Sequence, residues 1–172
     1  MSEPRVSAEP LRTDRLDLLP LRVEHAEQMA AALADPALHR FIGGEPLSPD
    51  ALRARYERLV AGSGDPAVSW CNWVLRLRAG ACLVGTVQAT ITADGIAEIA
   101  WVIGTPWQRR GLASEAARGL VAWLEQGPVH TVVAHVHPAH QASAAVAAAA
   151  GLAPTEEWQD GEVRWRRQRL PR

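Results

Sequence analysis

The chain has 172 residues and a formal net charge of −1, from 18 basic and 19 acidic residues. Apolar residue types make up 48% of it and charged types 22%, which is typical of a globular protein and excludes a disordered or fibrous chain. The balanced charge argues against a nucleic-acid-coating protein, and no apolar run is long enough to cross a membrane. The length predicts a single domain over residues 1–172.

The N-terminal residues 1–9 are polar and contain proline, which predicts a flexible tail rather than a secretory signal peptide. Cys71 and Cys82 form neither a C-x-x-C motif nor a disulfide framework. We therefore expect two small buried thiols in a cytoplasmic protein.

The first part of the chain predicts one strand and two helices. Leucines recur over residues 11–21, which indicates a strand. Apolar residues at spacings of three and four predict a helix over residues 23–33, and Asp35-Pro36 ends it because the residue before proline avoids the α region. Ser48-Pro49-Asp50 has the residue types of a helix start, so a second helix is expected to reach about Val60.

The rest of the chain predicts a sheet with two more helices. Turn dipeptides separate three short apolar segments and indicate an antiparallel meander over residues 70–77, 82–91 and 96–103. We then expect a helix over residues 114–126, a strand over 131–137 and a helix over 142–150. A final hairpin is expected around Asp160-Gly161. The order β-α-α-β-β-β-α-β-α-β-β predicts a mixed α/β domain.

A glycine-containing basic loop lies between the strand that ends at Ile103 and the following helix. The start of a helix binds anions, because its unpaired N–H groups and its dipole both favour negative charge. Gly111 allows close approach of the backbone or a positive φ, and Gln108 and two arginines add side-chain donors. The pattern indicates a phosphate or pyrophosphate ligand, with a solvated basic loop as the alternative. It matches neither a P-loop nor a Rossmann fingerprint.

This loop resembles the acyl-CoA pyrophosphate loop, Q/R-x-x-G-x-A, of the GNAT superfamily of N-acetyltransferases. Other segments resemble its ribosomal-protein-alanine acetyltransferase branch in the same order, at residues 11–16, 35–40, 97–103 and 137–152. The resemblance implies a single GNAT-like domain with a mixed, mostly antiparallel sheet, splayed between its fourth and fifth strands, and helices on both faces. It also implies an acetyl-CoA-dependent enzyme, monomeric or homodimeric, whose bound primary amine, on a peptide or a small molecule, attacks the thioester directly.

The resemblance implies contacts to the coenzyme from three places. The pantetheine arm would pair with main-chain groups near Val102 and Ile103. The next helix would contact the coenzyme through His140 and Ser143. The pyrophosphate would lie on Gln108, Arg109, Arg110, Gly111, Leu112, Ala113 and Ser114.

Two positions depart from the family pattern. His140 stands where the family has Asn, and the segment 144–150 lacks the tyrosine with which many relatives protonate the leaving thiolate. These departures keep two alternatives open, namely another acyl or aminoacyl donor and a catalytically weak acyl-CoA-binding module.

Glu98 is the only charged residue in the strand 96–103, on the face that also carries Ala100 and Val102. It is either a solvated carboxylate or the general base that removes the proton of an incoming ammonium group. The acceptor pocket is expected to include Phe41, Trp101 and Trp158, with the alternative that most of the seven tryptophans are core residues.

His135, His137 and His140 have a spacing that a zinc ion could use. No catalytic carboxylate pattern accompanies them, and the implied fold needs no metal. We favour a polar strand end beside the coenzyme and expect no metal site.

Overall fold

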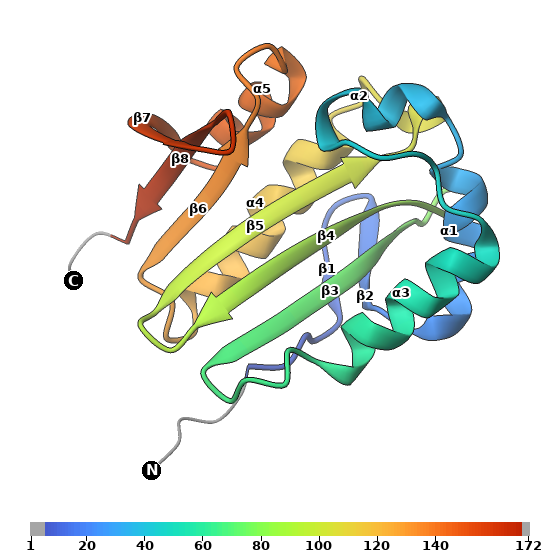
Figure 1. Cartoon of the computed structure of the whole chain (residues 1–172), viewed down its shortest axis with the longest axis horizontal. Helices are drawn as coiled ribbons and strands as arrows, with labels where there is room; N and C mark the ends of the chain where they lie inside the picture. The colour runs from blue at the N-terminus through green and yellow to red at the C-terminus, as the bar shows by residue number, and fades with distance from the viewer. Residues whose placement is uncertain (1–5, 170–172) are drawn as a thin grey trace.

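A computed structural model describes residues 6–169. Its centre is an eight-stranded sheet in the order β1-β2-β3-β4-β5-β6-β8-β7 (Figure 1). Within the described residues only the β5–β6 pair is parallel, so the prediction of a mixed, mostly antiparallel sheet is confirmed. The strands are β1 (Leu11–Arg12), β2 (Leu16–Pro20), β3 (Val68–Leu77), β4 (Cys82–Thr92), β5 (Ile96–Ile103), β6 (Thr131–Val136), β7 (Ala153–Gln159) and β8 (Glu162–Gln168).

Helices cover both faces of the sheet, as predicted (Figure 1). One face packs against α4 (Leu112–Glu125) and α5 (Gln141–Ala149), and the other against α1 (Ala26–Ala32) and α3 (Pro49–Ala61). The short α2 (His39–Ile42) lies between α1 and α3 in the chain. No helix within residues 6–169 has the length and apolarity needed to cross a bilayer.

Each face of the sheet has its own core. The larger core lies under α4, where Leu120 and Leu124 are buried with Ile99 of β5. Full burial of side chains of this size contributes about 1.5–3 kcal/mol each. The smaller core joins Met29 and Leu52 to Val74 of β3. Because this second core is small, part of the sheet face beneath α1 and α3 stays open, and a cavity lies there.

The N-terminal elements differ from the prediction in three ways. The expected strand over 11–21 is a hairpin, because the chain turns at Thr13, whose N–H donates to the carbonyl of Leu16. Neither α2 nor the 3₁₀ turn Pro36–Leu38 was predicted, since such short elements carry no periodicity. Residues 1–5 of the expected tail lie outside the described residues, but residues 6–9 pack on the sheet, with the carbonyl of Glu9 accepting from Trp73.

The elements from β3 onward lie close to their predicted positions. The α4 helix begins two residues earlier than expected, at Leu112, and its N-cap is Gly111. The final strands meet at the predicted turn, where Asp160 and Gly161 both have positive φ.

The sheet opens between β5 and β6. The two strands pair only where Ile96–Glu98 faces Thr131–Val133, and beyond these residues they diverge (Figure 1). The predicted splay is therefore confirmed. Its open end lies at the carboxyl ends of both strands, flanked by the start of α5.

Candidate active site

The loop before α4 has the backbone of an anion site. Gly111 has a φ of +75° and Arg109 one of +63°. The N–H of Glu115 makes an intrahelical hydrogen bond to the carbonyl of Gly111, so the amides of Leu112, Ala113 and Ser114 point out of the helix end. A Cβ at Gly111 would meet nothing nearer than Arg15, at 3.5 Å. The left-handed conformation, rather than lack of space, therefore requires glycine here.

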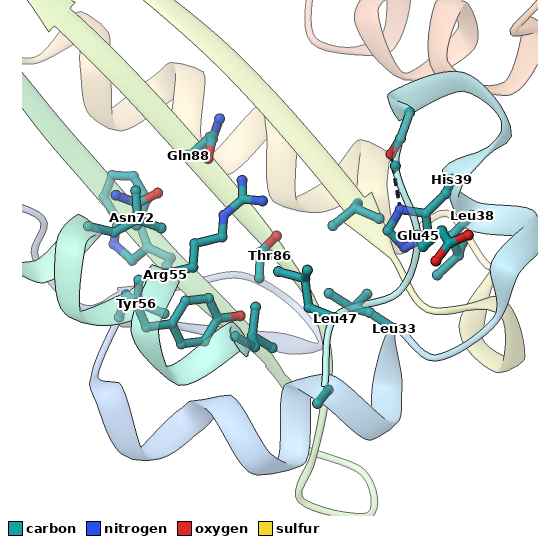
Figure 2. A pocket seen from close by; sticks show the side chains of 18 residues that line it. Leu33, Leu38, His39, Glu45, Leu47, Arg55, Tyr56, Asn72, Thr86 and Gln88 are labelled. Carbon is teal, nitrogen blue, oxygen red and sulfur yellow. Dashed lines mark hydrogen bonds between the residues drawn. The ribbon is translucent and has the colours of Figure 1, made fainter. Parts of the chain in front are cut away.

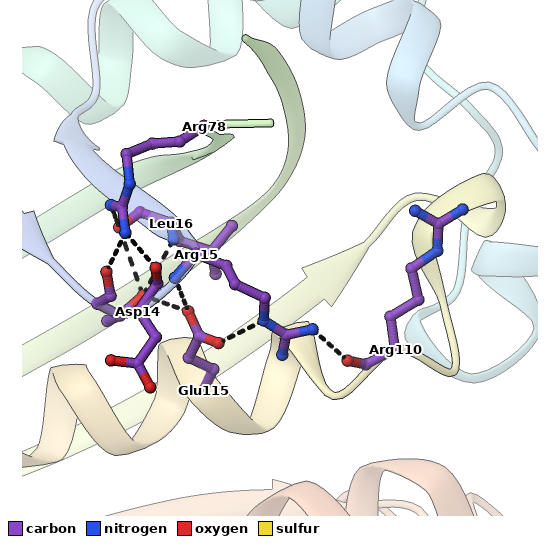
Figure 3. A network of polar contacts seen from close by, with 7 residues as sticks. Asp14, Arg15, Leu16, Arg78, Arg110 and Glu115 are labelled. Carbon is purple, nitrogen blue, oxygen red and sulfur yellow. Dashed lines mark hydrogen bonds and ion pairs between the residues drawn. The ribbon is translucent and has the colours of Figure 1, made fainter. Parts of the chain in front are cut away.

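A buried carboxylate anchors this loop to the N-terminal hairpin (Figure 3). One oxygen of Glu115 accepts from the Thr13 hydroxyl at 2.5 Å and from the Arg15 N–H at 2.9 Å, and the other accepts from the Arg15 guanidinium at 2.7 Å. The same guanidinium donates to the carbonyl of Arg110 at 2.8 Å. Thr13, Arg15 and Glu115 thus fix the loop's position, a role that the sequence analysis missed.

The charge of Glu115 depends on this network. Burial raises the pKa of its carboxyl group, but the hydrogen bonds from Thr13 and Arg15 outweigh that effect and hold the pKa below its usual value. Glu115 is therefore ionised at neutral pH and forms a charge-assisted contact with Arg15.

The side chains of the loop divide into two groups. Arg109 and Arg110 are exposed, and neither forms an ion pair with any residue between 6 and 169. Gln108 instead donates to the carbonyl of Ile103 at 3.0 Å. Its side chain therefore holds the loop against the end of β5, which differs from the expected donor to a phosphate.

The start of α5 is capped by a histidine. Nδ1 of His140 accepts from the N–H of Ser143 at 3.2 Å, so His140 and not Ser143 is the capping residue. Burial and the neighbouring His137 lower the pKa of His140, so the ring is neutral at neutral pH and its Nε2 carries a hydrogen. The imidazole can thus still donate to a coenzyme, although the family's amide is absent.

Phe41 of α2 touches the start of α5. Its ring stacks on His140 with centroids 4.3 Å apart and lies 5.2 Å from the ring of His137. Phe41 therefore bridges from α2 to the β6–α5 junction, beside the open end of the splay.

Glu98 forms a pair with His135 across the splay. Its Oε1 lies 2.8 Å from Nδ1 of His135, with the Glu98 side chain 52% exposed and the His135 side chain 9% exposed. Within the described part of the chain, Nε2 of His135 is buried without a hydrogen-bond partner, as is Nε of Arg164, which faces His135 in the β6–β8 register.

The histidines do not converge on a common point. His135 faces Glu98, whereas His137 and His140 contact Phe41. Over residues 6–169 no group of three or more His, Cys, Asp or Glu side chains is placed to hold a metal ion.

A cavity of about 360 Å³ lies on the Glu98 face of the sheet (Figure 2). Leu33, which caps the end of α1, and Leu52 of α3 belong to its apolar wall. Its floor is polar and comes from the sheet, where Asn72, Thr86 and Gln88 project. Val102 also lines it, and strand alternation places Glu98 two positions further along the same face.

The aromatic residues expected around the acceptor do not surround this cavity. Trp101 faces the opposite side of the sheet and packs against the core under α4. Trp158, on β7, is 60% exposed, and Phe41 contacts the histidines. Gly43 and Gly44, which follow Phe41 closely in the chain, do line the cavity, together with Tyr56, which the sequence analysis left without a role.

Comparison with known protein families gives a match over most of the chain. The acetyltransferase (GNAT) domain matches residues 15–153. No curated protein is similar enough in sequence to count as a match.

Solved structures share the fold at low sequence identity. RimL, a ribosomal L7/L12 α-N-protein acetyltransferase in complex with coenzyme A, is 16% identical with a TM-score of 0.79, covering 94% of this chain and 98% of its own. The ribosomal-protein-S5-alanine acetyltransferase from Vibrio fischeri is 16% identical with a TM-score of 0.73, covering 93% and 96%. AAC(6')-Ib, in complex with paromomycin and acetyl-CoA, is 14% identical with a TM-score of 0.75, covering 91% and 94%.

Proposed function

Because the chain belongs to the GNAT acetyltransferase family and acetyl-CoA is the donor, we propose that it transfers the acetyl group to a primary amine, on a peptide N-terminus or a small molecule. The observation that carries this proposal is the position of Glu98. It lies at the point where β5 and β6 part, on the same sheet face as the cavity. A donor in the splay and an acceptor in the cavity would therefore meet beside one carboxylate.

We propose that the coenzyme lies along the splay. Its pyrophosphate binds the amides of Leu112, Ala113 and Ser114, with Arg109 and Arg110 as flexible cationic partners. Among the strands of residues 6–169, none pairs with β5 on the β6 side beyond Glu98, so main-chain groups near Val102 and Ile103 are available to the pantetheine arm. His140 and Ser143 flank it from the start of α5, where the ring of Phe41 of α2 stacks on His140.

The reaction needs one proton acceptor. Glu98 removes a proton from the ammonium group, and the free amine attacks the thioester carbonyl to form the C–N bond. The C–S bond then breaks, the second proton leaves the nitrogen and protonates the departing thiolate, and coenzyme A leaves as the free thiol. The pair with His135 orients Glu98, which makes His135 a positioning residue. A thiol with a pKa near that of cysteine, about 8.5, is a tolerable leaving group, so no tyrosine is needed as general acid.

We propose that the acceptor binds in the cavity. Val102 joins the cavity to the edge of β5, so an amine held there has a direct route to the coenzyme. Proteins of the same fold include a ribosomal L7/L12 α-N-protein acetyltransferase and an enzyme bound to paromomycin, which supports testing both peptide and small-molecule amines.

The test is turnover of acetyl-CoA with a panel of peptide and small-molecule amines. Turnover is measured as release of the free thiol and as the mass of the product. We expect amine-dependent thiol release and a product 42 Da heavier than the amine, one acetyl group in place of hydrogen. Thiol release with a longer acyl-CoA only would favour the other-donor alternative. Coenzyme binding without turnover would favour the weak binding module. We place the enzyme in the cytoplasm as a monomer or homodimer.

A further inference from the structure

The cavity contains polar side chains that the fold itself does not use. Arg55 and Tyr56 of α3 line it, and so do Asn72, Thr86 and Gln88 from the sheet. Within residues 6–169, none of these side chains makes a hydrogen bond or an ion pair with another residue, although each has groups that can. Arg55 and Gln88 are exposed and Asn72 and Thr86 are half-buried, so water can reach these groups and a ligand that enters the cavity can replace it.

Arg55 determines which charge a ligand in the cavity should carry. Its side chain extends from α3 across the cavity toward Thr86 and Gln88 (Figure 2). Glu45, the carboxylate among the lining residues, lies at the other end beside His39 (Figure 2). The Arg55 end therefore presents an unpaired positive charge next to uncharged hydrogen-bonding groups.

Tyr56 adds a donor to the same end. Burial raises the pKa of its hydroxyl to about 12, so the group is protonated at neutral pH. A guanidinium, a phenol hydroxyl and the amides of Asn72 and Gln88 together suit the oxygens of a carboxylate or phosphate.

We propose that the acceptor is a primary amine that also carries an acidic group, which Arg55 binds within the cavity. This inference rests on the proposed function, because it names the substrate class of the same site. In the sheet register, Gln88 faces Ala100, and Glu98 lies two residues beyond Ala100. Gln88, at the Arg55 end, and Glu98, at the amine, are thus one strand spacing apart across the sheet and two residues apart along β5. These spacings put the acidic group about 5–10 Å from the amine. The α-carboxylate of an α-amino acid lies closer than this to its own amine, so the separation fits instead an acidic residue second in a peptide, or a short ω-amino acid.

The experiment compares matched amines that differ only in the acidic group. The peptide pair is Ala-Glu-Ala amide and Ala-Gln-Ala amide, and the small-molecule pair is 6-aminohexanoate and its amide. We expect the acidic member of at least one pair to have a kcat/KM about 10–100-fold higher, the range of a hydrogen bond to a charged group. The pair that shows the larger ratio identifies whether the acid comes from a peptide or a small molecule.

The variant Arg55→Gln should remove this preference, while Arg53→Gln, on the same helix but not lining the cavity, should keep it. Equal kcat/KM for both members of each pair, or a preference that survives Arg55→Gln, would overturn the inference while leaving amine acetylation intact. If no amine is acetylated, the proposed function fails, and calorimetry of the same pairs decides the inference alone. Binding of an acidic amine that is lost in Arg55→Gln supports it, and equal or absent binding overturns it.

Discussion

The two sides of the candidate site differ in whether main-chain or side-chain groups face the ligand. On the coenzyme side, the anion site consists of main-chain amides at the start of α4, and buried side chains such as Glu115 hold it in place from behind. On the acceptor side, the cavity has a floor and wall of side chains with free polar groups, drawn from α1, α3 and the sheet. Backbone conformation therefore controls the first side, and side-chain chemistry controls the second.

Glu98 stands at the boundary between these two sides, so its substitution should have the largest effect. Glu98→Gln keeps the shape but removes the proton acceptor, so kcat near neutral pH should fall by about 10²–10⁴ with little change in coenzyme affinity. Higher pH should restore part of the loss, since more of the amine is then neutral. A rate near that of the wild type across pH 6–9 would make Glu98 a solvated surface group.

His135 sharpens the same prediction. If it only orients Glu98, His135→Gln should lower kcat less than Glu98→Gln, and the double variant should be no slower than Glu98→Gln alone. The measurement is kcat over the same pH range for all three variants. Additive losses would show that His135 acts independently of Glu98.

On the coenzyme side, Gly111→Val should weaken coenzyme A binding by more than tenfold, measured by calorimetry. Valine is strained at a φ of +75°, so the backbone amides would move away from the pyrophosphate. Gly161→Val is the matched control, since it has a φ of +79° in the distant β7–β8 turn. Unchanged affinity in Gly111→Val would remove the loop from the coenzyme site.

The anchor behind that loop should show itself in stability. Glu115→Gln loses the charge-assisted contacts to Thr13 and Arg15, which predicts a loss of about 1–3 kcal/mol in the free energy of unfolding at pH 7. The pKa of Glu115 is lower in the folded than in the unfolded state, so the carboxylate's contribution is full above the unfolded value, about 4.3. It is lost as the pH falls through the folded pKa.

Urea unfolding of both proteins between pH 7 and pH 3 measures this difference, which should shrink only at the acidic end. The control is Glu24→Gln, which breaks the exposed pair with Arg22 and should cost less than about 1 kcal/mol. If the difference in the free energy of unfolding between wild type and Glu115→Gln did not change with pH, the loss would come from packing and not from the charge of Glu115.

The smallest effect on activity is expected at the two tryptophans that the sequence predicted for the acceptor pocket. Trp158→Ala should leave the KM of the amine and the stability nearly unchanged, because the side chain is 60% exposed and does not line the cavity. Trp101→Ala should lower stability, through its packing under α4, without changing that KM. A raised KM in both variants would return the acceptor to the predicted aromatic pocket.

The difference between the two sides also explains what the sequence could predict. The coenzyme loop is contiguous, and its glycine, its basic residues and the helix that follows it are all visible in one segment around Gly111. The strand 96–103 was predicted with its bounds, since its apolar run is flanked by a turn and by Thr105-Pro106. Most elements from β3 onward could be placed in the same way.

The acceptor side could not be predicted because its residues meet only in the fold. Arg55 and Tyr56 look like ordinary surface and core positions of a helix, and Gln88 like one residue of a strand. Their common cavity depends on how α3 packs on the sheet, which no local pattern encodes. Strand alternation turns Trp101 toward α4, so it does not line this cavity, and an aromatic acceptor pocket stays a prediction.

Initial rates over a grid of acetyl-CoA and acidic-amine concentrations test the division between the two sides most directly. Gly111→Val should raise the KM for acetyl-CoA by more than tenfold and leave the KM for the amine within about twofold, and Arg55→Gln should do the reverse. If either variant changed both constants together, with Gly161→Val and Arg53→Gln unaffected, the two sides would not be separate sites and the account would be contradicted.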